Sequence, residues 1–111
     1  MTGSLEATEA MSKAVQKTPN RVTLEYMKSQ IAGEYYTTAD QAFSDAPILN
    51  GMDVYTICMI VMKNGFMIVG KSAPADPENF DRALGQKFAY EDAIRQLWPL
   101  EAFALRERMS A

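Results

Sequence analysis

The sequence contains no histidine and a single cysteine among its 111 residues. Without histidine, the chain lacks the base of Ser-His and Cys-His catalytic pairs, the commonest metal ligand and the ordinary switch near neutral pH. One cysteine, Cys58, permits no internal disulfide and no zinc cluster of the Cys/His kind. These absences exclude most familiar hydrolytic and metal chemistry, and we expect neither a metal nor a cofactor.

Positive charge and long apolar runs are also scarce. Eleven Lys and Arg stand against 14 Asp and Glu, which gives a net charge of −3, the wrong sign for a general binder of nucleic acid. The longest apolar run spans residues 57–62, whereas a membrane helix needs about 20 residues. The first 20 residues lack the basic-then-apolar layout of a signal peptide. We therefore expect a soluble cytoplasmic protein that does not bind membranes.

The chain length predicts a single domain. We interpret residues 1–20 as an N-terminal tail because they are mostly small or polar; one weak amphipathic helix, ordered against a partner, is the alternative. Residues 21–111 form the domain. Thr23 looks like an N-cap, and the apolar spacing that follows predicts a helix over about 24–34. A short helical turn is expected at 39–43.

Two apolar runs, 54–62 and 66–71, flank an Asn64-Gly65 pair. This pattern predicts an antiparallel β-hairpin with a two-residue type I′ turn, because that turn needs positive φ at both central positions. The register then places Met62 opposite Met67. One face would carry Cys58, Ile60, Met62, Met67 and Val69, and the other Ile57, Met59, Val61, Phe66 and Ile68.

Both faces of this hairpin are apolar, so both need cover, and its open edges need partners. We expect either added strands from the loop at 48–53 or, as the favoured alternative, a second copy of the chain in a homo-oligomer.

The C-terminal third predicts helices. Asp76 has the character of an N-cap and Pro77 of a first helical position, so a short helix should run from there to Gly85. A longer helix follows from Gln86, and Pro99 should break it. The expected fold class is therefore α+β: an N-terminal helix, an antiparallel hairpin and C-terminal helices broken at Pro99.

Several motifs in this part of the chain follow one another in a distinctive order. They are Lys63-Asn64-Gly65-Phe66, Gly70-Lys71-Ser72-Ala73, Asp76-Pro77-Glu78-Asn79-Phe80-Asp81, Gly85 and Trp98-Pro99-Leu100. As a set they resemble the small phage protein family named after gene product 49 of coliphage N-four and gene 66 of phage Sf-six, over about residues 21–109. Ala102 departs from that family, which tends to carry Gly there.

The resemblance implies a phage or prophage source and a place in the host cytoplasm. It carries no catalytic residues over, because no function is assigned to the family. Small phage proteins often act on host machinery, and several sequester nucleotide-derived immune signals.

Candidate ligand residues come from three features. The loop at 71–79 leads from a strand to a helix N-terminus, where an anion could bind with help from Lys71 and Ser72; the alternative is that acidic side chains of the loop cap that helix. Tyr35 and Phe66 offer stacking surfaces or core packing. The arginines Arg95, Arg106 and Arg108 could clamp a phosphate or form a solvated face.

Our leading hypothesis is a non-enzymatic phage binding protein for counter-defence or host takeover, which sequesters a nucleotide-derived immune signal of the cyclic nucleotide or ADP-ribose type. The ligand would lie between subunits against Tyr35, Phe66, Lys71, Ser72, Asn79 and Arg95. The alternative is an inhibitor or adaptor that binds a host protein through the Met-rich hairpin. A third hypothesis is a hydrolase that uses the acidic cluster Asp76, Glu78 and Asp81.

Overall fold

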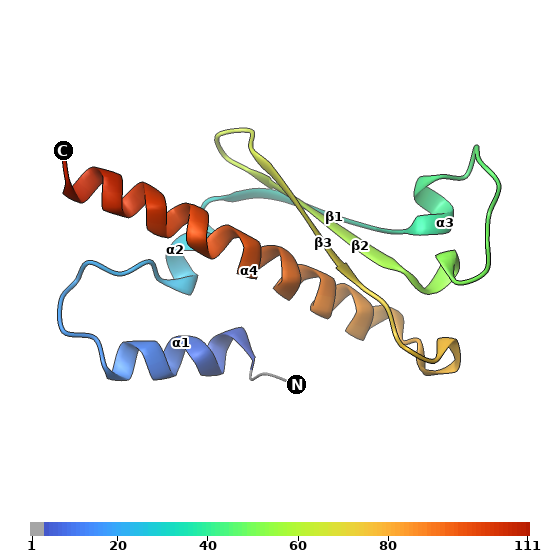
Figure 1. Cartoon of the computed structure of the whole chain (residues 1–111), viewed down its shortest axis with the longest axis horizontal. Helices are drawn as coiled ribbons and strands as arrows, with labels where there is room; N and C mark the ends of the chain where they lie inside the picture. The colour runs from blue at the N-terminus through green and yellow to red at the C-terminus, as the bar shows by residue number, and fades with distance from the viewer. Residues whose placement is uncertain (1–3) are drawn as a thin grey trace.

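The computed structural model describes residues 4–111. In chain order the elements are α1 (Leu5–Ala14), α2 (Leu24–Ser29), β1 (Ile31–Thr38), α3 (Ala39–Ala42), the 3₁₀ turn η1 (Met52–Val54), β2 (Thr56–Met62), β3 (Met67–Ser72), the 3₁₀ turn η2 (Pro77–Asn79) and α4 (Arg82–Met109). The strands form one antiparallel sheet in the order β1-β2-β3, and α4 lies across one of its faces (Figure 1). The expected α+β class is confirmed.

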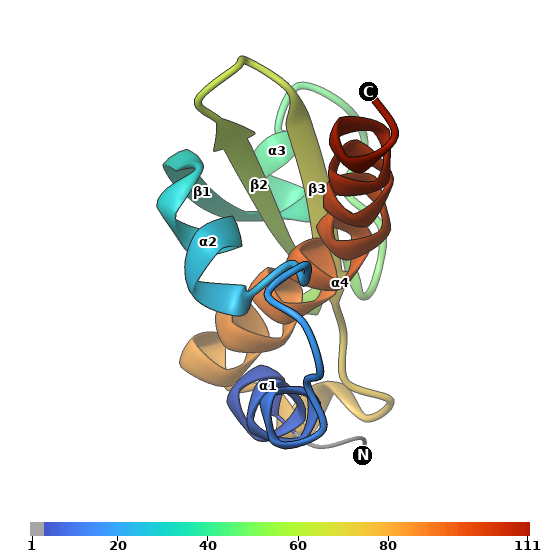
Figure 2. The same cartoon turned by 90° about the vertical axis from the view of Figure 1, so that its left-hand side faces the viewer.

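The core lies between α4 and the sheet, and α1 and α2 close it from one side (Figure 2). Its members are Leu5, Val22, Leu24, Met27, Cys58, Ile60, Met62, Ile68, Ala89, Ala93, Ile94 and Leu97. Met27, Ile60 and Ile94 are fully buried. Cys58 of the predicted hairpin is fully buried.

The helix expected at 24–34 is correct in its first half and wrong in its second. The Thr23 hydroxyl accepts the Tyr26 N–H at 3.0 Å, so the predicted N-cap is confirmed. The helix ends at Ser29, and residues 31–38 form β1, which pairs with β2. The run Tyr35-Tyr36-Thr37-Thr38 has strong strand propensity, and pairing with β2 overrides the helical spacing of the apolar residues. The added strand thus comes from 31–38, and not from 48–53.

The hairpin exists as expected, but its turn is one residue longer. Gly65 has φ +88°, while no non-glycine residue described in the structure has positive φ, so Asn64 does not adopt the type I′ conformation. The Gly65 N–H donates to the Met62 carbonyl at 2.9 Å, which is typical of a three-residue loop with glycine in the left-handed position.

The longer turn shifts the register by one residue. Val61 pairs with Met67, and Ile60 with Ile68. Because side chains alternate along a strand, this shift moves every β3 side chain to the opposite face from the one expected. Ile68 therefore joins the core, and Val69 points outward.

The expected break at Pro99 is absent, because α4 runs unbroken from Arg82 to Met109. Leu97 and Leu105, on either side of the proline, both pack on the core and hold the two halves in line. Gly85 does not end a helix either. A β carbon at Gly85 would lie 2.7 Å from the Thr56 hydroxyl, so glycine lets the first turns of α4 approach β2.

The short helix expected from Asp76 to Gly85 is wrong in its extent. Asp76 caps a turn as predicted, but that turn is the 3₁₀ segment Pro77–Asn79; the chain then runs extended, and Asp81 is the N-cap of α4, which begins at Arg82 and not at Gln86.

Part of the expected N-terminal tail is packed on the domain. Residues 1–3 of that segment lie outside the described residues, but Leu5 of α1 is buried in the core. The Glu9 carboxylate binds the Arg21 guanidinium and accepts the Leu24 N–H at 2.7 Å. A second, more exposed ion pair joins Glu6 of α1 to Lys28 of α2 at 3.4 Å, so one buried apolar residue and two ion pairs dock α1 against α2 and the segment before it.

α4 also closes the outer edge of the sheet at β3. The Lys71 N–H donates to Asp92 Oδ2 at 3.0 Å, and Gln96 Nε2 donates to the Val69 carbonyl at 2.8 Å. These backbone groups point away from β2, so side chains of α4 occupy positions that a further strand would need. At the β3 edge, for which the sequence predicted a partner, these two backbone groups are therefore satisfied within the chain.

The sheet face turned away from α4 has no cover among residues 4–111. Its apolar side chains, which we call the open face, are Tyr35, Ile57, Met59, Val61, Met67 and Val69. The exposed fractions of Tyr35, Met67 and Val69 are 58%, 57% and 52%. With one sheet layer and one main helix, the molecule is flat and long, with extents of 50 × 29 × 17 Å.

Candidate functional site

A groove of about 390 Å³ separates the tip of the hairpin from the C-terminal half of α4. We call it the hairpin groove; its polar and aromatic lining includes Tyr26, Lys63, Phe66, Glu101 and Arg108. The rings of Tyr26 and Phe66 are 41% and 55% exposed, so both offer surface to a ligand. The lining carries two cationic side chains and one carboxylate, so its net charge is positive, whereas the net charge of the whole chain is negative.

Local hydrogen bonds fix the hairpin side of the groove. The Phe66 N–H donates to Asn64 Oδ1 at 2.9 Å, and the Phe66 carbonyl accepts the Met62 N–H at 2.8 Å. The Lys63 N–H donates to the carbonyl of Gln30 at 2.9 Å, which ties the turn to the end of α2. The aromatic ring and the lysine therefore project from a backbone that is held on both sides.

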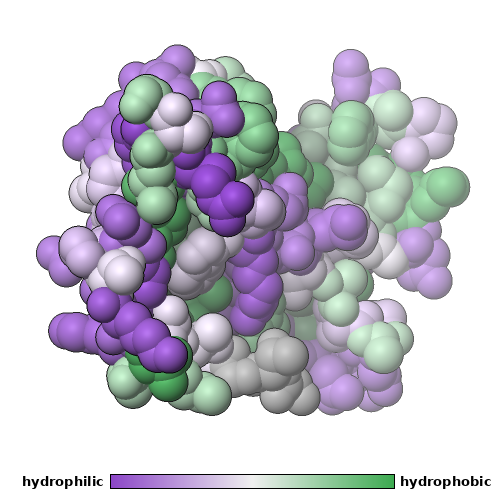
Figure 3. All heavy atoms as spheres, turned by 60° about the vertical axis from the view of Figure 1, so that its left-hand side comes forward, coloured by the Kyte–Doolittle hydropathy of each residue, from purple (hydrophilic) through white to green (hydrophobic). Residues whose placement is uncertain are grey.

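The unbroken course of α4 supplies the other wall. Arg108 lies in the last turn of that helix, beside the hairpin tip. Figure 3 shows apolar and polar residues interspersed over this end of the molecule. A helix that stopped at Pro99 would leave the groove without this wall.

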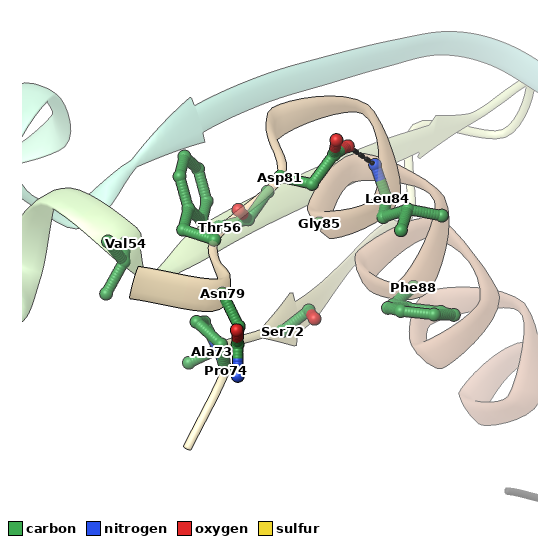
Figure 4. A pocket seen from close by; sticks show the side chains of 11 residues that line it. Val54, Thr56, Ser72, Ala73, Pro74, Asn79, Asp81, Leu84, Gly85 and Phe88 are labelled. Atoms are coloured by element: carbon green, nitrogen blue, oxygen red, sulfur yellow. Dashed lines mark hydrogen bonds between the residues drawn. The ribbon is translucent and has the colours of Figure 1, made fainter. Parts of the chain in front are cut away.

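A second, smaller pocket of about 160 Å³ lies where β3, η2 and the start of α4 meet (Figure 4). Ser72 and Asn79 line it, as does Thr56, whose buried hydroxyl has no hydrogen-bond partner among the described residues. We call it the loop pocket. No Lys or Arg of residues 4–111 lines it, so its charge does not favour a phosphate.

Two of the three candidate hydrolase carboxylates have structural roles beside this pocket. Asp76 Oδ1 accepts the Glu78 N–H at 3.0 Å, and Asp81 Oδ1 accepts the Leu84 N–H at 2.8 Å (Figure 4). Both are therefore caps of their helical turns. In the part of the chain that the structure describes, no group of three or more His, Cys, Asp or Glu is placed to hold a metal ion.

The six sequence-predicted ligand residues do not form one site within a single chain. Phe66 lines the hairpin groove, and Ser72 and Asn79 line the loop pocket. Tyr35 belongs to the open face, and Lys71 lies at the end of the same face. Arg95 lies exposed on α4 and lines neither the groove nor the pocket.

Sequence reasoning missed Tyr26 and Lys63 as partners of Phe66. Tyr26 lies on the exposed side of α2, outside the apolar repeat. An aromatic residue at such a position is a signal from which a binding role could have been predicted. Lys63 stood beside the turn, but its approach to α4 depends on the tertiary fold. Arg108 was a candidate for phosphate binding, and it is the arginine that lines the groove.

Three titratable groups lie at the core between the sheet and α4: the buried Cys58 of β2, and the partly buried Tyr36 of β1 and Tyr90 of α4. Burial raises the pKa of the Cys58 thiol, which keeps it neutral and unreactive. Burial, together with a hydrogen bond in which the Tyr36 hydroxyl donates to Glu34 at 2.9 Å, also raises the pKa of Tyr36. Burial raises the pKa of Tyr90 to about 12. None of these groups is an activated nucleophile.

No helix in the described part of the chain combines the length and apolarity needed to cross a membrane. A search of curated proteins and a search of solved structures each found no match. A family model, in contrast, matches residues 22–109, which include the sheet, both walls of the hairpin groove and the loop pocket. The chain belongs to the phage protein (N4 Gp49/phage Sf6 gene 66) family.

Proposed function

We propose that this phage protein is a non-enzymatic binding protein that sequesters a nucleotide-derived signal in the host cytoplasm, for counter-defence or host takeover. The ligand class is that of cyclic nucleotides or ADP-ribose derivatives. The observation that carries the proposal is the meeting of two exposed aromatic rings and two cations in one groove of about 390 Å³. Grooves of roughly 300–1,000 Å³ are the usual size for small ligands.

The groove matches the two chemical parts of a nucleotide. Tyr26 and Phe66 provide flat apolar surface, and stacking of a base on an aromatic ring contributes about 1–3 kcal/mol. Arg108 presents a planar donor fork that suits phosphate oxygens, and Lys63 adds a second positive charge. Glu101 lies in the same lining and can accept a hydrogen bond from a sugar hydroxyl or a base amine.

Binding without turnover agrees with the chemistry available. The chain has no histidine, the thiol of Cys58 is buried, and Asp76 and Asp81 are occupied as helix caps. These features support sequestration rather than hydrolysis.

Thermal-shift and calorimetric titrations with ADP-ribose and with cyclic dinucleotides test the proposal. We expect at least one of them to bind, and Phe66→Ala or Arg108→Gln to weaken that binding roughly tenfold or more. Arg106→Gln is the matched control, because Arg106 lies two positions away and lines a different hollow.

The ligand should be recovered intact after the protein is denatured. Recovery of cleaved ligand would support the hydrolase hypothesis instead. Failure of every nucleotide to bind, or an equal effect of the Arg106 and Arg108 substitutions, would overturn the proposed function.

A further inference from the structure

The open face is an exposed apolar surface that no segment of residues 4–111 covers. Its side chains form a continuous surface, because the register places Tyr35 beside Met59 and Met59 beside Val69. We propose that a second copy of this chain packs on the open face, so that two sheets stack face to face about a two-fold axis. This proposal is independent of the nucleotide ligand.

The area available is sufficient for such a dimer. Three exposed and three partly exposed side chains together present roughly 500 Å² of apolar surface per copy, and large side chains account for most of it. Burial on both copies removes roughly 1,000 Å², which is about the lower bound for a specific interface.

The dimensions of the single chain point the same way. A compact domain of this length has a radius of gyration of about 13 Å, but this chain has 16.5 Å. Its accessible surface is 7701 Å², compared with about 6,100 Å² for a typical folded monomer of this mass. An excess of accessible surface is expected for a single sheet that has a helix on one face and no cover on the other.

Charge favours a second copy over a partner of different chemistry. The face has one charged side chain, Lys71, which lies in its outermost row. A strongly charged partner would find no complement at the centre, whereas a second copy presents the same apolar side chains. The flexible Met59 and Met67 can adjust to fill the space between two stacked sheets.

The alternative route to self-association through the hairpin is closed. Asp92 and Gln96 of α4 bond the outward Lys71 N–H and Val69 carbonyl, so a second copy would have to displace both side chains to add a strand at the β3 edge. The face, and not this edge, is the part of the hairpin left for a partner.

Sedimentation velocity on the full chain at micromolar concentration tests the proposal. We expect twice the mass of one chain for the natural sequence. Val69→Lys should raise the dimer dissociation constant roughly a hundredfold, because it places a charge in the apolar open face. Phe103→Lys, at another exposed apolar position, on α4, is the matched control and should leave the dimer intact.

Circular dichroism must show that each variant is folded. If Val69→Lys does not fold, Met67→Lys provides a second substitution on the same face. A monomer for the natural sequence overturns the proposal. So does loss of the dimer in Phe103→Lys without loss in Val69→Lys. A monomer that binds a purified host protein through the open face would assign the face to the host-protein hypothesis instead.

Discussion

Gly70 of β3 and Ala89 of α4 touch through their backbones. A β carbon built on Gly70 would lie 2.0 Å from the Ala89 carbonyl oxygen and 2.6 Å from the Ala93 nitrogen. Since Ala89 and Ala93 are fully buried, the helix has no room to retreat without opening the core. This contact fixes the distance between the two layers of the fold.

Gly70→Ala should therefore destabilise the protein by about 3 kcal/mol or more, since overpacking forces a backbone shift. Gly33→Ala is the control. Its β carbon would meet the exposed ring of Tyr35 at 3.0 Å, which can move aside, so the cost should stay below about 1 kcal/mol. Urea unfolding measures both. Equal losses in the two variants would show that the Gly70 contact does not limit packing.

Gly65→Ala should cost about 1–2 kcal/mol, because alanine is strained at φ +88°. Asn64→Asp should be nearly neutral, because aspartate keeps the acceptor for the Phe66 N–H and Asn64 itself has no positive φ. Thermal unfolding compares the two. A type I′ turn would instead make both positions sensitive.

Glu9→Gln should loosen α1 from the domain. Burial raises the pKa of Glu9, but hydrogen bonds from Arg21 and the Leu24 N–H outweigh this effect and hold the pKa below its usual value. A lowered folded pKa means that this stabilisation is present near neutral pH and lost as the pH falls through the folded pKa. We expect a loss of about 2 kcal/mol at pH 7.

Hydrogen exchange of the amides in 5–14 measures this loosening. The natural sequence should approach the behaviour of Glu9→Gln only as the pH falls through the lowered folded pKa of Glu9. Glu25→Gln, on the exposed side of α2, is the control. If protection of α1 is unchanged in Glu9→Gln, the Glu9 contacts do not hold the helix, and its docking rests on Leu5 and the Glu6–Lys28 ion pair.

Tyr90 should make the fold less stable in alkali. Burial raises its pKa to about 12, whereas tyrosine in an unfolded chain ionises near pH 10. Between these values the folded chain keeps a proton that the unfolded chain has released, so the free energy of unfolding falls as the pH rises. Tyr90→Phe should lose less stability between about pH 8 and pH 11 in urea unfolding. Parallel losses would exclude this origin.

Local signals in the sequence were sufficient for the caps and the hairpin. Thr23, Asp76 and Pro77 act within a few residues of themselves, and each begins the turn that its chemistry predicted. The same signals divide the sequence into separate helical and strand segments, and this division is enough to predict the α+β class. β1 was missed because its pairing with β2 joins residues far apart in sequence, and no local pattern at 31–38 records that partner.

The hairpin register and the candidate site needed the tertiary fold. Two-residue and three-residue loops both accept Asn-Gly, and the choice moved every β3 side chain between core and surface. The hairpin groove joins Tyr26, Lys63 and Arg108 from three distant segments. Arg108 reaches the groove because α4 continues past Pro99. The sequence predicted the opposite, since proline usually breaks or kinks a helix.

The covering of β3 by Asp92 and Gln96 also limits how far this protein can polymerise. A sheet with two free edges can add copies without end, as fibrils do. Here the sheet can be extended only at β1, and two copies joined there would use both free edges at once. For single chains, strand addition therefore closes at a pair, so strand addition alone cannot build a fibril from them.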